Sequence, residues 1–167
     1  MIPALRSAFA RCYAKACARS AISRIPSGPW YTAYIDAITA NPHLELVAVC
    51  DEIVDRARAT GEKAEVPYFT SYVEMLDSVP ADVAANCTPS GLHPRQGILA
   101  AERKLQVICE KPMATRLEEA DALVRACDDA GVHLFVVKQN RLNPSIQLLK
   151  RSIDAGRFGR IYLANTT

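Results

Sequence analysis

The sequence predicts an α/β fold in which a parallel β-sheet is covered by helices on both faces. From residue 32 onward, short apolar segments alternate with segments of helical periodicity. The apolar segments contain many β-branched residues, which is typical of buried strands. Strands that are joined by crossover helices run parallel, so both faces of their sheet need a covering layer.

Local start and stop signals place the individual elements. Ser71 and Thr115 each begin a capping box, and Gly61, Gly131 and Gly156 are expected just after helix ends. The expected strands are residues 44–50, 67–69, 83–87, 107–109, 132–137 and 160–164. The expected helices are residues 32–40, 52–60, 71–77, 94–104, 115–130 and 143–155.

Length and composition exclude several classes of protein. The chain has 167 residues and a net charge of +2, which suits one domain with the beginning of a second. A charge this close to zero argues against a dedicated nucleic-acid binder. The longest apolar runs, residues 46–50 and 134–137, are far shorter than the roughly 20 residues of a membrane span. We therefore expect no nucleic-acid partner and no membrane association.

The six cysteines match no zinc-binding spacing, so no metal site is expected. Small buried thiols are typical of a reducing compartment. The cysteines therefore favour a cytoplasmic location.

The N-terminal segment differs from the rest of the chain in charge. Residues 1–35 contain five basic residues and no acid, whereas residues 36–167 contain 15 basic and all 18 acidic residues. Three interpretations remain open: a transit peptide, a basic tail that binds a partner, or sequence from a wrong reading frame or start. We expect residues 1–31 to be an atypical basic segment outside the fold.

The ends of the expected strands carry polar residues, and ligands of parallel sheets bind outside the carboxyl ends of the strands. Asp51 follows the strand at residues 44–50. An acid at this position can accept hydrogen bonds from an adenosine ribose, and it would favour NAD over NADP by repelling a 2′-phosphate. The alternative is an acid that caps the following helix.

Two further strands end in residues suited to binding. Thr88 and Ser90 offer hydroxyls after the strand at residues 83–87, Pro89 stiffens the turn, and His93 lies at the entry of the next helix. A simple loop with a helix cap is the alternative. After the strand at residues 132–137, Arg141 could form two hydrogen bonds with a carboxylate or phosphate. Asn143 is interpreted only as a helix cap.

Glu110, Lys111 and Pro112 follow the strand at residues 107–109. A lysine at this edge can bind a substrate hydroxyl and, with its pKa lowered by burial, help to move the hydroxyl proton. Pro112 fixes the backbone and is a candidate for a cis peptide bond. The alternative is an exposed ion pair on a loop.

These motifs together resemble the Gfo/Idh/MocA oxidoreductase family over about residues 35–167, with Glu110-Lys111-Pro112 as the most specific part. The stretch from Lys138 to Pro144 is similar to the branch that oxidises nucleotide-linked N-acetyl amino-sugar uronates in surface-polysaccharide synthesis. The resemblance implies an N-terminal Rossmann domain, then a larger domain with an antiparallel sheet that carries much of the substrate site. Full-length relatives are expected to be homo-oligomers.

The resemblance also implies roles for individual residues. Lys111 would contact the sugar hydroxyl that is oxidised, and Asp51 would hold the adenosine ribose of NAD. The residues expected along the nicotinamide and its ribose are Thr88, Pro89, His93 and Glu110. Asn140 and Arg141 would face the nicotinamide or the substrate. The implied reaction is hydride transfer from a sugar or nucleotide-sugar carbon to NAD.

The sequence departs from the family pattern at both ends. A glycine-rich turn that holds the pyrophosphate is expected roughly 20 residues before Asp51. That window contains only Gly28, together with Pro26 and Pro29, which have no N–H to offer. We therefore expect an incomplete Rossmann-like domain at residues 32–158 that lacks its first strand and turn. Residues 159–167 are interpreted as the first strand of a truncated second domain.

Two hypotheses follow. The family identity predicts an NAD-dependent sugar oxidoreductase. The departures predict that the isolated chain is inactive, a non-catalytic remnant with little or no cofactor binding. Without a first strand the sheet would lack its central member and expose two strand edges, unless residues 1–30 supply a substitute.

Overall fold

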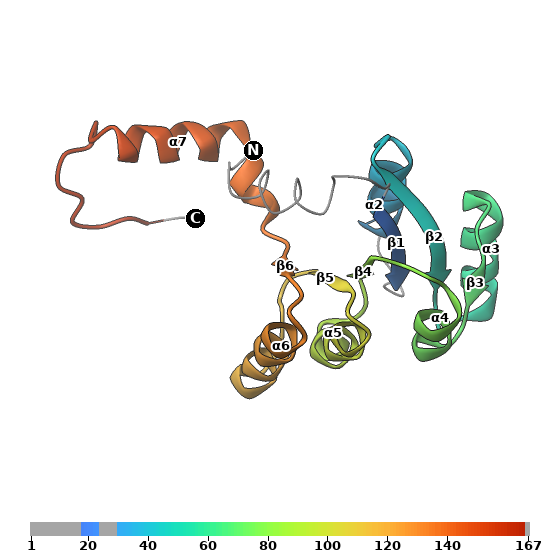
Figure 1. The fold of residues 1–167 in the computed structure, drawn as a ribbon. Helices are drawn as coiled ribbons and strands as arrows, with labels where there is room; N and C mark the ends of the chain where they lie inside the picture. Colours follow the sequence, from blue (N-terminus) through green and yellow to red (C-terminus); the bar gives the residue numbers. More distant parts are fainter. Residues whose placement is uncertain (1–17, 24–29, 166–167) are drawn as a thin grey trace. The chain divides into compact units, whose positions relative to one another are not determined.

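The computed structural model describes residues 18–23 and 30–165 (Figure 1). The chain divides into two compact units, one that ends at Val137 and one that begins at Lys138. Each unit is described by itself. No helix in the described ranges is long and apolar enough to cross a membrane.

The first unit contains a six-stranded parallel sheet in the order β3-β2-β1-β4-β5-β6. The strands are β1 (Ala18–Ser23), β2 (Leu44–Cys50), β3 (Tyr68–Phe69), β4 (Val83–Asn86), β5 (Gln106–Cys109) and β6 (Leu134–Val136). The chain passes from β1 outward to β3 and then returns to the other side of β1 as β4. The sheet is therefore doubly wound, as expected for a Rossmann-like domain.

The central strand corrects one expectation from the sequence. We expected the first strand to be missing, yet residues 18–23 pair with β2 on one side and with β4 on the other. The sequence Ala-Arg-Ser-Ala-Ile-Ser has no apolar run, and this is why periodicity did not reveal a strand. Backbone groups alone form a parallel ladder, so a polar sequence can fill the position. The two inner edges that we expected to be open are consequently paired.

The other part of that expectation lies outside the described residues. The turn that should hold a pyrophosphate falls within residues 24–29, and the basic segment at residues 1–17 is not described either. The boundary expected at residue 31 is nevertheless too late for the fold, since β1 and the start of the first helix precede it.

Helices cover the two faces of the sheet. They are α2 (Trp30–Thr39), α3 (Val54–Ala64), α4 (Tyr72–Ser78), α5 (His93–Glu102) and α6 (Leu117–Ala130). Ala84 and Val107 point into the core with α5 and α6, whereas their chain neighbours Ala85 and Ile108 pack with α2. This alternation follows from the two-residue period of a strand.

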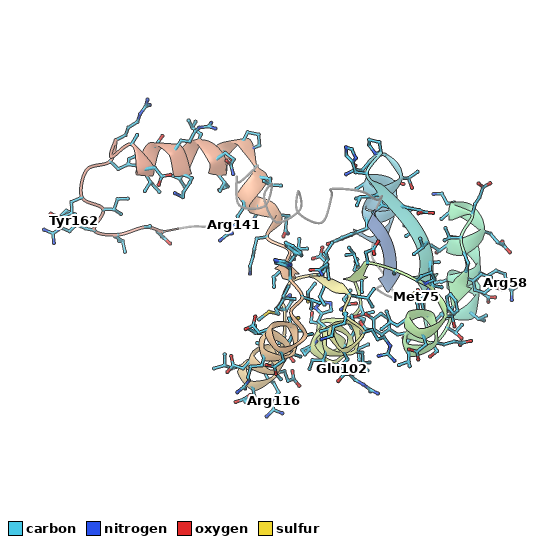
Figure 2. All side chains as sticks on the ribbon, viewed as in Figure 1. Arg58, Met75, Glu102, Arg116, Arg141 and Tyr162 are labelled. Carbon is cyan, nitrogen blue, oxygen red and sulfur yellow. The ribbon has the colours of Figure 1, made fainter. Side chains whose placement is uncertain are left out.

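The layers are visible in the figures. Figure 1 shows α4, α5 and α6 along one side of the sheet. In Figure 2, Met75 lies in the core, where it is fully buried, whereas Arg58 and Glu102 lie on exposed surfaces.

Three local expectations need correction. Gly61 lies inside α3 rather than after it. A glycine is needed there because a Cβ would come within 2.8 Å of the Val66 carbonyl oxygen. The left-handed residue that ends α3 is Glu65. The Thr115 side chain does not cap α6, whose N-cap residue is Arg116. The Ser71 cap is confirmed, since Ser71 Oγ accepts a hydrogen bond of 3.3 Å from the Glu74 N–H.

The second unit contains a short 3₁₀ turn, η2 (Gln139–Leu142), and the helix α7 (Pro144–Asp154). Gly156 follows α7 with a φ of 66°, as the sequence predicted. Residues 161–165 form neither helix nor paired strand. A lone strand has no partner for a ladder, so the assignment of this segment to a second domain stays a prediction.

Candidate cofactor and substrate site

The sheet places most of the predicted site residues at one edge. The chain reverses its direction of winding at β1, between β2 and β4, and this is the switch point where ligands of such sheets bind. Asp51 follows β2, Thr88 and Pro89 follow β4, and Glu110 and Lys111 follow β5. Because the strands are parallel, all these residues lie beyond the same ends of the sheet.

Two of the residues that contact the Asp51 side chain are close to it in sequence. Its side chain is 97% buried, and Oδ1 accepts a hydrogen bond of 2.9 Å from the Ile53 N–H. The Arg56 guanidinium lies 3.4 Å from the same oxygen. Asp51 therefore stabilises the turn that leads into α3, but it is not the helix cap of the alternative interpretation, because the N-cap residue is Ile53.

The turn after β4 is supported by a polar network. The Thr88 hydroxyl donates to Gln96 Oε1, and the Tyr72 hydroxyl donates to Asn86 Oδ1 at 2.8 Å. Asn86 is fully buried, and Thr88 is 7% exposed. A hydrogen-bonded network of this kind fixes side-chain orientation, since an unpaired buried group would be costly. Pro89, in contrast, is exposed at the tip of the turn.

His93 joins two of the turns. It is 1% exposed, with Nε2 2.6 Å from the Thr88 carbonyl oxygen and Nδ1 2.8 Å from the Pro112 carbonyl oxygen. A neutral imidazole donates from one nitrogen only, so its tautomer decides which carbonyl receives the hydrogen bond. Either way, the ring bridges the turn after β4 and the turn after β5.

The turn after β5 contains the motif Glu110-Lys111-Pro112. The peptide bond between Lys111 and Pro112 is cis. The Glu110 carboxylate does not pair with the Lys111 ammonium, which forms no ion pair within the described part of the chain. The alternative of an exposed ion pair on a loop is therefore wrong. Lys111 is exposed and its ammonium is available to a ligand.

Glu110 is held instead by two donors. Oε1 accepts from the Tyr34 hydroxyl at 2.9 Å, and Oε2 accepts from the Lys111 N–H at 3.1 Å. Tyr34 was not expected at the site, because it precedes Glu110 by 76 residues and belongs to no local motif. Burial raises the pKa of Tyr34 far above its usual value, and the nearby Cys87 and Glu110 add to this shift.

Buried thiols lie just behind the polar edge. Burial raises the pKa of Cys50 to about 12, and the neighbouring Asp51 contributes. Burial likewise raises the pKa of Cys109 to about 12, with a contribution from Glu110. A thiol is a weak nucleophile, so neither group is suited to covalent chemistry. Within the described residues, no cluster of His, Cys, Asp and Glu could hold a metal ion.

Asn140 and Arg141 belong to the second unit. Both side chains are exposed, and Asn143 Nδ2 lies 3.5 Å from Asn140 Oδ1. The Asn143 side chain does not cap α7, although Asn143 is its N-cap residue. The structure therefore brings together six of the eight predicted site residues, and the placement of Asn140 and Arg141 at the same site stays a prediction.

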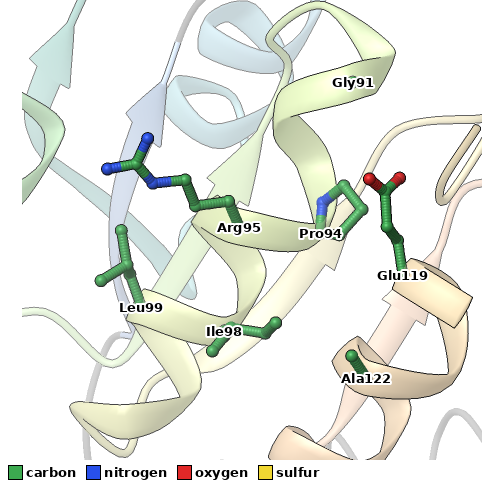
Figure 3. Close-up of a pocket in the computed structure, with 7 residues that line it drawn as sticks. All are labelled: Gly91, Pro94, Arg95, Ile98, Leu99, Glu119 and Ala122. Atoms are coloured by element: carbon green, nitrogen blue, oxygen red, sulfur yellow. The ribbon is translucent and has the colours of Figure 1, made fainter.

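A groove between α5 and α6 is a second candidate for a ligand-binding site. It has a volume of about 300 Å³, and its lining is largely apolar (Figure 3). The lining residues are Gly91, Pro94, Arg95, Ile98, Leu99, Glu119 and Ala122. None of these residues was predicted to contact a cofactor or a substrate, so the edge of the sheet remains the better candidate.

Comparison with known proteins agrees with this geometry. The family model GFO_IDH_MocA, described as an oxidoreductase family with an NAD-binding Rossmann fold, matches residues 27–138. The chain is 43% identical to the WlbA dehydrogenase of Bordetella pertussis, solved with NADH and UDP-GlcNAcA. The match has a TM-score of 0.83 and covers 87% of this chain and 45% of that one.

Two other relatives support the same assignment. The WlbA dehydrogenase of Chromobacterium violaceum, also solved with NADH and UDP-GlcNAcA, is 40% identical with a TM-score of 0.84, over 89% of this chain and 43% of that one. D-apiose dehydrogenase of Paraburkholderia graminis is 34% identical over 69% of this chain and 31% of its own length. The chain thus spans less than half the length of these relatives.

Proposed function

Because the chain belongs to the Gfo/Idh/MocA family of oxidoreductases with an NAD-binding Rossmann fold, we propose that it supplies the cofactor domain for hydride transfer from a sugar or nucleotide-sugar carbon to NAD. The observation that carries this proposal is the polar edge of the doubly wound sheet. Acidic, hydroxyl and lysine side chains follow β2, β4 and β5 on both sides of the switch point.

The residues at this edge fit a dinucleotide. The Asp51 carboxylate lies at the end of β2, where the adenosine ribose would be bound, and its negative charge favours NAD over NADP. Thr88, Pro89, His93 and Glu110 would then line the nicotinamide and its ribose. When bound, NAD supplies the hydride acceptor.

Lys111 is the proposed catalytic residue. Its exposed ammonium would bind the oxygen of the sugar hydroxyl and stabilise the negative charge that develops as the O–H bond breaks. The carbon loses its hydrogen as a hydride, and the hydroxyl proton passes to water at Lys111. The remaining turn residues keep Lys111 in place rather than taking part in the chemistry.

The substrate class is proposed from the relatives. Both WlbA dehydrogenases were solved with UDP-GlcNAcA, and D-apiose dehydrogenase is named for a free sugar. The greater identity to the WlbA proteins favours a nucleotide-linked sugar acid. In that case the Arg141 guanidinium would bind a carboxylate or phosphate of the substrate, together with Asn140.

Titration of the purified chain with NADH, followed by NADH fluorescence, tests the cofactor role. We expect saturable binding with a sub-millimolar Kd, and weaker binding of NADPH. The Asp51→Ala variant should lose about tenfold in affinity through the lost ribose contacts. Asp121→Ala, which removes an exposed carboxylate from α6, is the matched control and should bind like the wild type.

The outcome that contradicts the proposal is equally clear. If the folded chain shows no saturation with either dinucleotide, the chain is the non-catalytic remnant described above. If Asp51→Ala and Asp121→Ala bind NADH equally well, the ribose is held elsewhere.

A further inference from the structure

We propose that Tyr34 is a positioning residue that acts through Glu110 to hold the backbone of Lys111. Its importance for hydride transfer rests on the function proposed above. The sequence motifs described above assign no role to this tyrosine.

Both oxygens of the Glu110 carboxylate accept hydrogen bonds. The Tyr34 hydroxyl donates to Oε1 at 2.9 Å, and the Lys111 N–H donates to Oε2 at 3.1 Å. A carboxylate with a donor on each oxygen is restrained in rotation about its last torsion angle, which is otherwise broad. The two hydrogen bonds therefore connect α2 to the backbone of Lys111 through a single side chain.

The Tyr34 hydroxyl remains a hydrogen-bond donor. Burial, Cys87 and Glu110 all raise the pKa of its hydroxyl, so the group stays protonated over the whole range in which an enzyme works. It can donate to Glu110 at any such pH, but it cannot serve as a proton acceptor. Tyr34 is therefore suited to positioning the Glu110 carboxylate.

The hydroxyl and the ring of Tyr34 make different contacts. The Tyr34 ring packs with Ile35 and Ile38 of α2 against Ala85 and Cys87. A phenylalanine would keep this packing, because the ring is unchanged. Core packing alone therefore does not account for a hydroxyl aimed at Glu110 Oε1.

The Tyr34→Phe variant tests the proposal in the chain without cofactor. Loss of the hydroxyl frees Oε1, so the carboxylate can rotate and Oε2 leaves the Lys111 N–H. Hydrogen exchange at the Lys111 amide, measured by NMR, should become about fivefold faster, in keeping with the loss of one modest hydrogen bond. The exchange of the β5 amides should not change.

The matched control is Tyr68→Phe, which removes a hydroxyl from the partly exposed β3. It should leave exchange at Lys111 unchanged. An unchanged rate in Tyr34→Phe would overturn the proposal, and so would a Lys111 amide that is already unprotected in the wild type.

A double-mutant cycle on NADH affinity then tests whether Tyr34 acts through Glu110. If Tyr34 acts through Glu110, Tyr34→Phe adds nothing to the loss caused by Glu110→Ala, whereas additive losses would contradict this route. If the wild type binds no NADH, the proposed function fails. The hydrogen-exchange rate of the Lys111 amide would still test the positioning role of Tyr34.

Discussion

Two carboxylates at the edge of the sheet are held in different ways. Asp51 and Glu110 each follow a strand directly, and each accepts a hydrogen bond from a backbone N–H one or two residues further on. The Asp51 carboxylate also lies 3.4 Å from the Arg56 guanidinium, five residues away, whereas the Glu110 carboxylate also accepts a hydrogen bond from Tyr34, which is 76 residues away. The described partners of the Glu110 side chain therefore include one much farther away in sequence than the described partners of the Asp51 side chain.

This difference separates the two halves of the candidate site. In the turn after β2, the Asp51 side chain contacts Ile53 and Arg56 near the start of α3, and the Asp51 N–H donates to the Phe69 carbonyl oxygen of β3 at 3.1 Å. The turn after β5 depends on α2 through Tyr34 and on α5 through His93. We therefore expect perturbations elsewhere in the domain to affect Glu110 and Lys111 more than Asp51.

The largest expected effect concerns the thiols that precede the two carboxylates. The pKa of both Cys50 and Cys109 is raised from 9.0 to about 12, mainly by burial. At pH 8 the thiolate fraction of each is on the order of a thousandfold below that of an exposed cysteine. Alkylation followed by mass spectrometry should show both peptides unmodified in the native protein and modified rapidly in urea.

The same thiols predict the direction of alkaline unfolding. A folded-state pKa above the unfolded value stabilises the fold below about pH 9, and this contribution is lost as the pH rises towards 12. The melting temperature should therefore fall across that window. Rapid native alkylation of Cys109 but not Cys50 would instead show that the turn after β5 opens locally.

The next largest effect is expected at His93. His93→Ala removes a buried ring and leaves the Thr88 and Pro112 carbonyls without this partner, which should lower the free energy of unfolding by about 2–4 kcal/mol. Urea denaturation measures the change. The exposed His133 is the control, and His133→Ala should cost less than about 1 kcal/mol. Equal losses in the two variants would refute the bridging role.

A smaller effect distinguishes the two carboxylates directly. Asp51→Asn keeps an acceptor for the Ile53 N–H but loses the charge that faces Arg56, so we expect a loss of about 1 kcal/mol in stability. Glu110→Gln keeps an acceptor for Tyr34 and should cost a similar amount. Combined with Tyr34→Phe, only Glu110→Gln should show non-additive thermal unfolding. Equal coupling of Tyr34 to Asp51 would contradict the comparison.

The sequence predicted much of this fold because its signals are local. The apolar run at residues 44–50 gave β2 with the correct bounds, and the helix ends at Gly131 and Gly156 were also correct. Gly61 was misassigned because its role is a close approach to Val66 and Tyr68, which sequence does not display. The central strand β1 was not predicted because its sequence has no apolar pattern. Only its position between β2 and β4 identifies it as a strand.

In the candidate site, too, local sequence signals were predictable and tertiary contacts were not. Polar residues after strands identified Asp51, Thr88, Glu110 and Lys111, since the ends of parallel strands share one edge. The partners that hold them, Tyr34 and Gln96, come from helices and carry no motif. The sequence could therefore indicate which groups lie beyond the ends of the strands, but not which groups keep them in place.

The central claim is that one dinucleotide contacts both turns of this edge. An NMR titration of the labelled chain with NADH tests it most directly, through the amide shifts of Ile53, after β2, and Lys111, after β5. We predict that both amides shift with the same saturable, sub-millimolar Kd. Binding that shifts neither amide, or that shifts only the groove residues Gly91 and Ala122, would contradict the claim.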